Sequence, residues 1–169
     1  MIKPGYFLLF ILSLTACTQK QSIDDLQKSI EAKLAEQPGA FAVAFASLSS
    51  NEQLLINAQE LFHAASTMKT PVMVEVYKQV AEGKFSLKDS IVIKNEFISI
   101  VDGSTYSLTP DSDSDTLIYK HIGEKRTIYS LMYDMIIISS NLSTNLIIDL
   151  VDAKNVTQTL RDISANDIQ

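Results

Sequence analysis

The sequence has one cysteine, two histidines and no tryptophan among its 169 residues. A single cysteine cannot form a disulfide within the chain, and two histidines with one cysteine offer too few ligands for a zinc-type site. Basic residues are also few, since 14 Lys and Arg stand against 20 Asp and Glu, which gives a formal net charge of −6. This acidic balance argues against nucleic acid as a partner. We therefore expect no metal, no cofactor and no nucleic-acid partner.

The first 16 residues have the pattern of a secretory signal peptide, with Lys3 followed by an apolar run that is too short for an ordinary membrane helix. Leu14-Thr15-Ala16-Cys17 resembles the bacterial lipobox, in which the cysteine becomes lipidated after cleavage. The alternative is ordinary cleavage that leaves a free thiol. We expect a signal peptide over residues 1–16, a tether over residues 17–21 and a lipid on Cys17. The protein is then a bacterial lipoprotein, anchored to a membrane in the periplasm or at the cell surface.

The remaining residues, 22–169, have a length that suits one domain. Apolar spacing and turn residues predict four helices and three extended segments. The helices are expected at about residues 22–37, 127–138, 142–151 and 155–163, and the extended segments at about residues 40–48, 53–57 and 90–93. Residues 102–115 are polar and predict a solvated surface loop. We reject a calcium loop there, because Thr116 and Ile122 stand where glycine and glutamate are required.

A further helix is predicted to begin close to Ser66, because Pro71 is tolerated only in the first turns of a helix. Its expected buried face consists of Met68, Val72, Met73, Val76, Tyr77 and Val80. The free N–H groups at a helix start favour a developing negative charge beside Ser66. Lys69 lies three residues on, and a lysine in an apolar pocket can lose its proton and act as a base. The alternative for this S-x-x-K spacing is a serine N-cap followed by a solvated lysine.

A second polar motif, Ser139-Ser140-Asn141, lies at the junction of two predicted apolar helices. Polar side chains are costly at such a junction unless they serve a site or a cap. The S-x-N pattern also occurs at residues 49–51, 143–145 and 164–166, so its placement carries more weight than its letters.

The order of the two motifs resembles the serine beta-lactamase and penicillin-binding protein superfamily, in which S-x-x-K is followed by S-D-N and then K-T-G. The resemblance is closer to class A beta-lactamases and covers their N-terminal portion only. It implies an α/β fold, with a helical domain beside an antiparallel sheet and the site between them. Here the sheet is expected to be truncated before its later strands and reduced to its first hairpin.

The resemblance also implies the roles of the site residues. Ser66 attacks the lactam carbonyl and becomes an acyl-enzyme, and its backbone N–H forms half of an oxyanion hole. Lys69 takes or relays the proton of Ser66, and Ser139 passes a proton to the leaving nitrogen. Asn141 hydrogen-bonds the substrate and helps to hold Lys69. A monomeric enzyme that confers resistance to beta-lactam antibiotics is expected, without a cofactor.

The sequence departs from the family pattern in three respects. Ser140 replaces the aspartate that usually holds the loop of the second motif. No glycine follows Gly123, so K-T-G is absent, and no glutamate follows Glu124, so the deacylation glutamate is absent as well. We therefore expect residues 22–169 to be a catalytic domain that is incomplete at its C-terminus, and not a competent beta-lactamase as written.

Two alternatives remain open. One is a penicillin-interactive hydrolase similar to D-alanyl-D-alanine peptidases, which uses the same first two motifs. The other is a noncatalytic lipoprotein that kept the fold as a relic. His63 and His121 are expected to have packing or surface roles only.

Overall fold

The computed structural model describes residues 22–168 of the chain. The predicted signal peptide, the tether and Cys17 lie outside these residues. No helix within the described range is long and apolar enough to cross a membrane. The chain divides into two compact units, and the boundary lies between Phe62 and His63.

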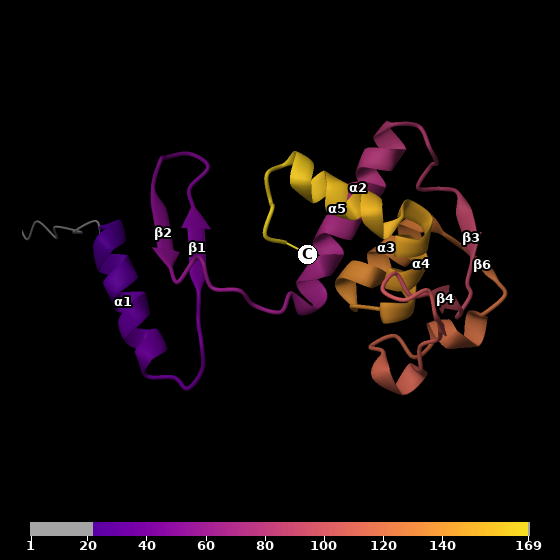
Figure 1. Ribbon diagram of the computed structural model, residues 1–169, viewed down its shortest axis with the longest axis horizontal. Helices are drawn as coiled ribbons and strands as arrows, with labels where there is room; N and C mark the ends of the chain where they lie inside the picture. The colour runs from indigo at the N-terminus through magenta and orange to yellow at the C-terminus, as the bar shows by residue number, and fades with distance from the viewer. Residues whose placement is uncertain (1–21, 169) are drawn as a thin grey trace, which may run out of the picture. The chain divides into compact units, whose positions relative to one another are not determined.

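The first unit consists of one helix and one hairpin (Figure 1). Helix α1 (Ile23–Ala35) begins after Ser22, whose hydroxyl accepts a hydrogen bond from the Asp25 N–H at 3.1 Å. Strands β1 (Val43–Ala46) and β2 (Gln53–Ile56) pair antiparallel, and α1 packs against β2. The predicted helix and hairpin are confirmed, although each element is shorter than expected.

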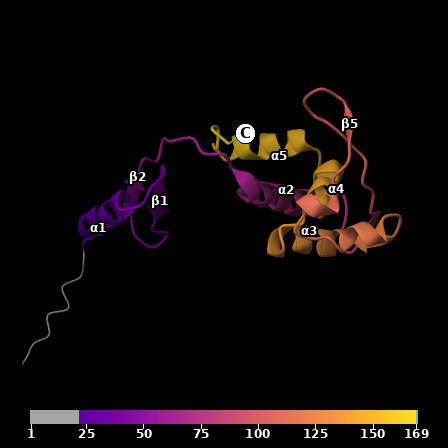
Figure 2. The same cartoon turned by 90° about the horizontal axis from the view of Figure 1, so that it is seen from below.

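The second unit is mainly helical (Figures 1 and 2). Its helices are α2 (Lys69–Ala81), α3 (Ile128–Ile137), α4 (Asn141–Val151) and α5 (Ala153–Asp162). Helix α2 packs against α4 and α5, and α3 packs against α4. The apolar core between them contains Val72, Val76, Ile93, Phe97, Ile118, Ile128, Leu131, Met135, Leu142, Leu146, Ile147 and Val151. The three helices predicted after residue 126 are confirmed to within a few residues.

Two further antiparallel ribbons complete the second unit. Strand β3 (Ser90–Val92) pairs with β6 (Lys125–Thr127), and β4 (Phe97–Ile98) pairs with β5 (Thr105–Tyr106). Strands β1 and β2 form a two-stranded sheet of their own, as expected for a sheet reduced to its first hairpin, and β3 confirms the extended segment predicted at residues 90–93. Strands β4, β5 and β6 are additional to the prediction. The broader expectation of helices beside antiparallel strands is confirmed.

The polypeptide around Ser66 differs from the prediction. Ser66 lies on a 3₁₀ turn, η1 (Ala65–Met68), and the α-helix begins only at Lys69. Pro71 therefore falls in the first turn of α2, where its missing N–H removes no intrahelical hydrogen bond. The predicted buried face is also partly wrong, because Tyr77 is 47% exposed while Glu75 and Gln79 are buried.

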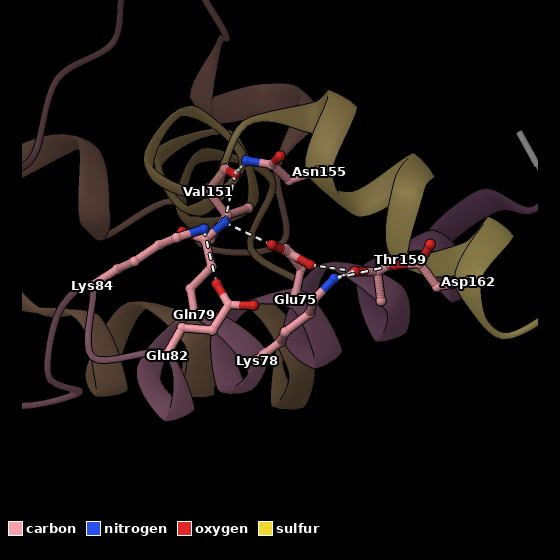
Figure 3. Close-up of polar contacts among 9 residues, drawn as sticks. All are labelled: Glu75, Lys78, Gln79, Glu82, Lys84, Val151, Asn155, Thr159 and Asp162. Atoms are coloured by element: carbon pink, nitrogen blue, oxygen red, sulfur yellow. Dashed lines mark hydrogen bonds and ion pairs between the residues drawn. The ribbon is translucent and has the colours of Figure 1, made fainter.

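A hydrogen-bonded network explains why polar side chains of α2 are buried (Figure 3). Glu75 is 1% exposed and accepts hydrogen bonds from the Gln79 amide at 2.7 Å and from the Thr159 hydroxyl of α5 at 2.6 Å. Lys78 donates to the same Thr159 oxygen at 2.7 Å. Gln79 also donates to the carbonyl of Val151 at the end of α4, at 2.8 Å. Because a buried carboxylate is stable only when it is hydrogen-bonded, this network fixes how α2 packs against α4 and α5.

Candidate active site

The turn that carries Ser66 has an unusual backbone. Ala65, the residue before Ser66, has a φ of +46°, a conformation that residues other than glycine rarely adopt. Neighbouring groups hold it there, since the Ala65 N–H donates to Nδ1 of His63 at 3.1 Å and the Thr67 N–H donates to the carbonyl of Ala64 at 3.1 Å. His63 is thus part of the turn, which agrees with the packing or surface role expected for it.

Ser139 lies in the short connection between α3 and α4 and also has a positive φ, of +59°. The Ser140 N–H donates to the carbonyl of Asp134 at 3.2 Å, which closes the end of α3. The Ser140 side chain is fully buried and caps α4 by accepting the Ser143 N–H at 3.2 Å. The strained position turns the side chain and the carbonyl of Ser139 toward the same neighbour, Lys69.

Side-chain hydrogen bonds connect the four residues Ser66, Ser139, Lys69 and Asn141 into one chain of contacts. The hydroxyl oxygens of Ser66 and Ser139 are 2.8 Å apart. The Lys69 ammonium donates to the Ser139 carbonyl at 2.7 Å, to the Ser139 hydroxyl at 2.8 Å and to Oδ1 of Asn141 at 3.0 Å. The structure thus places these residues side by side, while the chemical role of each stays a prediction.

The hydrogen bonds also show how Ser66 and Lys69 are connected. Among the hydrogen bonds of residues 22–168, none joins Ser66 directly to Lys69 through their side chains. The hydroxyl of Ser139 lies between them and bonds to both. A proton that leaves Ser66 therefore has a hydrogen-bonded path to Lys69 through Ser139.

The surroundings of Lys69 favour its neutral form. Its side chain is only 5% exposed, and this burial lowers the pKa of the ammonium group from its ordinary value of 10.5. The negative charge of Asp113 acts in the opposite direction and raises the pKa, but the effect of burial is larger. The solvated lysine of the alternative interpretation is therefore excluded.

Asp113 is a residue of this site that the sequence interpretation missed. The solvated loop predicted at residues 102–115 is wrong at Asp113 and Asp115, which are only 9% and 8% exposed. The Asp113 carboxylate accepts the backbone N–H groups of Asn141 and Leu142, each at 2.8 Å. Nothing in the local sequence around Asp113 indicates these partners, because they lie 28 and 29 residues further along the chain.

Tyr106 and Asn145 extend the site along α4. The Tyr106 hydroxyl donates to Oδ1 of Asn145 at 2.5 Å, and the Asn145 amide donates to the Asn141 carbonyl at 2.9 Å. Both line a mainly apolar cavity of about 330 Å³, together with Met68, Val72, Ile148 and Leu160. Among the described residues no group of His, Cys, Asp and Glu side chains could hold a metal ion.

The fold of this chain is similar to solved structures of PBP-A and of beta-lactamases. The chain superimposes on PBP-A with a TM-score of 0.68 and 26% identity, over 85% of this chain and 50% of that one. A beta-lactamase from Sphaerobacter thermophilus gives 0.65 and 28%, over 83% and 49%. An ancestral class A beta-lactamase gives 0.67 and 22%, over 83% and 50%, and shows the fold alone. The chain thus spans about half the length of these structures.

The fold expected from the resemblance to class A beta-lactamases is confirmed by these structures. No curated protein matches the sequence. The family model of the beta-lactamase enzyme family, named Beta-lactamase2, matches residues 25–169. Since this match covers most of the polypeptide, the chain belongs to the beta-lactamase enzyme family.

Proposed function

We propose that this chain carries the nucleophile, the base and the proton shuttle of a serine hydrolase that opens beta-lactam rings through an acyl-enzyme on Ser66. One observation carries the proposal: the continuous hydrogen-bonded path from Ser66 through Ser139 to the buried Lys69. Such a path is what an unactivated hydroxyl needs to become a nucleophile.

The acylation step follows from this path. As Oγ of Ser66 attacks the lactam carbonyl, its proton moves to the Ser139 hydroxyl, which passes its own proton to neutral Lys69. When the C–N bond of the ring breaks, the proton returns from Lys69 through Ser139 to the ring nitrogen. In its charged form Lys69 donates three hydrogen bonds. When the amine is neutral, the bond with the Ser139 hydroxyl reverses, so that the hydroxyl donates and the Lys69 nitrogen accepts.

Charge that develops on the carbonyl oxygen needs hydrogen-bond donors. We assign the backbone N–H of Ser66 to this role, since it lies at the start of a helical turn where N–H groups lack intrahelical partners. Asn141, whose side chain accepts a hydrogen bond from Lys69, is assigned to substrate binding. A related structure supports the reaction type, because a variant of PBP-A, 26% identical to this chain, has been solved as an acyl-enzyme complex with penicillin G.

The experiment is covalent labelling of the purified full chain with a fluorescent penicillin, followed by peptide mass mapping. We expect one adduct on Ser66, lost in Ser66→Ala and kept in Ser29→Ala, which removes an exposed serine of α1. Absence of the adduct from a chain with native helix content by circular dichroism contradicts the proposal. If the isolated chain lacks that content, a chimera in which residues 22–169 replace the matching half of PBP-A is labelled instead.

Labelling and turnover together distinguish a beta-lactamase-like hydrolase, a peptidase-like hydrolase and a noncatalytic relic. Without a glutamate after residue 124 and without K-T-G, we expect the chain as written to label but not to hydrolyse nitrocefin. A peptidase-like enzyme uses the same acylation step, and release of D-alanine from a peptide that ends in D-Ala-D-Ala identifies it. A noncatalytic relic gives neither label nor product.

Membrane anchoring through Cys17 is proposed separately. Metabolic labelling with a radioactive fatty acid in a bacterial host tests it. Incorporation into the chain that is lost in Cys17→Ser supports the anchor, while a secreted and unlabelled product contradicts it.

A further inference from the structure

We infer that Asp113 is a positioning residue of this site, whose carboxylate fixes the turn that presents Ser139 and Asn141 to Lys69. The inference rests on the proposed function, because the acylation of Ser66 is the step that Asp113 assists. Asp113 comes from the segment between β5 and β6, 28 residues before Asn141 in the sequence.

Asp113 binds the start of α4 through its carboxylate. Its two carboxylate oxygens accept the N–H groups of Asn141 and Leu142, one oxygen for each, at 2.8 Å. The Ser140 hydroxyl accepts the next N–H, that of Ser143. The first three N–H groups of α4, which have no partners within the helix, are thus all satisfied. A negative charge beside them is also favoured by the helix dipole.

The segment of Asp113 also orients the Asn141 side chain. The amide nitrogen of Asn141 donates to the carbonyl of Ser112, the residue before Asp113, at 3.2 Å. This contact leaves Oδ1 of Asn141 to accept from Lys69. The dipeptide Ser112-Asp113 therefore holds Asn141 at its backbone and at its side chain, and decides which atom of the amide faces Lys69.

Asp113 is itself held in place by its neighbours. The hydroxyl of Tyr119 donates to the carboxylate at 2.8 Å, and the Asp115 N–H donates to it at 3.1 Å. Burial acts to raise the pKa of Asp113, but its four hydrogen bonds outweigh burial, so the pKa lies below the usual range. Burial and the contact with Asp113 raise the pKa of Tyr119, which keeps its hydroxyl protonated as a donor. The charge of Asp113 is therefore permanent near neutral pH.

The charge of Asp113 also acts on the base. Among residues 22–168, Asp113 is the charged group whose field acts on Lys69, and this field raises the pKa of Lys69. Asn141 lies between them and bonds to both, so the two charges interact without a direct ion pair. Asp113 thus has two separable effects on acylation: it fixes the geometry, and it raises the pH at which Lys69 becomes neutral.

The experiment compares Asp113→Asn with Asp111→Asn, which removes an exposed carboxylate of the same segment. The rate of Ser66 labelling by a fluorescent penicillin is measured in the full chain from pH 6 to pH 10. We expect the maximal rate of Asp113→Asn to fall by about tenfold or more. Its rising limb is expected to move to lower pH, because loss of the negative charge lowers the pKa of Lys69. Asp111→Asn is expected to match the parent in both respects.

A second measurement does not depend on acylation. Nuclear magnetic resonance follows the titration of the Lys69 side chain and the exchange of the Asn141 and Leu142 amide hydrogens. We expect a lower pKa for Lys69 and faster exchange at both amides in Asp113→Asn. If the parent chain is not labelled, the proposed function fails and these data alone decide the role of Asp113. Unchanged titration and exchange overturn the inference, as does an unchanged rate profile in a parent that is labelled.

A milder variant covers the case in which Asp113→Asn does not fold. Tyr119→Phe removes one donor to Asp113 but keeps the charge and both contacts with α4. We expect it to lower the labelling rate a few-fold and to leave the rising limb where it is, because the field on Lys69 is unchanged. A rate equal to that of the parent counts against the inference.

Discussion

The hydroxyl of Ser139 lies 2.8 Å from the hydroxyl of Ser66, although 73 residues separate them in the sequence. Ser66 lies within η1 and Ser139 follows α3. Each serine sits at or next to a backbone position with positive φ. Packing of α2 against α3 and α4 is what brings them together.

Removal of the Ser139 hydroxyl tests the proton path. In Ser139→Ala we expect the labelling of Ser66 to fall about a hundredfold, because Lys69 loses its hydrogen-bonded connection to the nucleophile. The Ser139 carbonyl still accepts from Lys69, so the helix content should stay unchanged. Labelling rates and circular dichroism measure the two effects.

Ser143→Ala is the matched control for that variant. Ser143 is fully buried near the same turn, and its hydroxyl has no hydrogen-bond partner among the described residues. Its loss should leave the rate of labelling unchanged. Equal rates in both variants would show that Ser139 is not part of the proton path.

Replacement of Lys69 tests whether burial of this amine lowers the stability of the folded protein. In Lys69→Met we expect no labelling, while the free energy of unfolding at pH 7 stays equal or rises, because an apolar side chain replaces a buried amine. The folded-state pKa of Lys69 is lowered, so the unfolded chain binds more protons between that pKa and 10.5. The parent should therefore gain stability relative to Lys69→Met as the pH rises through this range.

Urea denaturation of both proteins from pH 7 to pH 10 measures this difference. If the difference in unfolding free energy between the parent and Lys69→Met is independent of pH, burial does not lower the pKa of Lys69.

Asp113 has a linkage to pH of the same sign as Lys69, but in the acidic range. Its folded-state pKa lies below the ordinary value of 3.8, so the stability that it adds is fully present above that value. This stability is lost as the pH falls through the folded-state pKa. We expect Asp113→Asn to be less stable than the parent at pH 7 and the difference to shrink below pH 3.8.

Thermal denaturation at a series of pH values measures the difference, with Asp111→Asn as the reference. If the two asparagine variants are equally stable at pH 7, the hydrogen bonds from Asn141 and Leu142 to Asp113 add nothing to stability.

The buried network around Glu75 gives a test that is independent of the site. Thr159→Val removes the hydroxyl that donates to Glu75 and leaves a buried carboxylate with one partner fewer. We expect a loss of about 1–3 kcal/mol in the free energy of unfolding. Thr157→Val, on the same helix but exposed, should cost less than about 0.5 kcal/mol. Urea denaturation measures both, and equal losses would contradict the structural role of the network.

Local patterns predicted most of the helices, because each has its own apolar periodicity and all but α2 have a side-chain N-cap. Thr127, which accepts the Ser130 N–H at the start of α3, shows how a cap marks a boundary. Strands β4 and β5 escaped prediction because two residues are too few for an alternating pattern.

Buried polar residues were predicted worst, since the partners that make their burial possible are distant in sequence. Glu75 depends on Thr159, and Asp113 depends on Asn141. For the site itself, the motifs identified Ser66, Lys69, Ser139 and Asn141, which side-chain hydrogen bonds connect in the structure. The bridging position of Ser139 required the three-dimensional arrangement of η1 and the turn before α4.

Every residue that hydrogen-bonds within the site belongs to the unit that begins at His63. In genetic terms, one uninterrupted stretch of codons specifies the whole constellation. A recombination event near codon 62 would transfer the nucleophile, the base, the shuttle and Asp113 together. Sequence drift in α1 and in the first hairpin would alter none of these contacts directly, so we expect substitutions to accumulate more freely there than between Ser66 and Asn141.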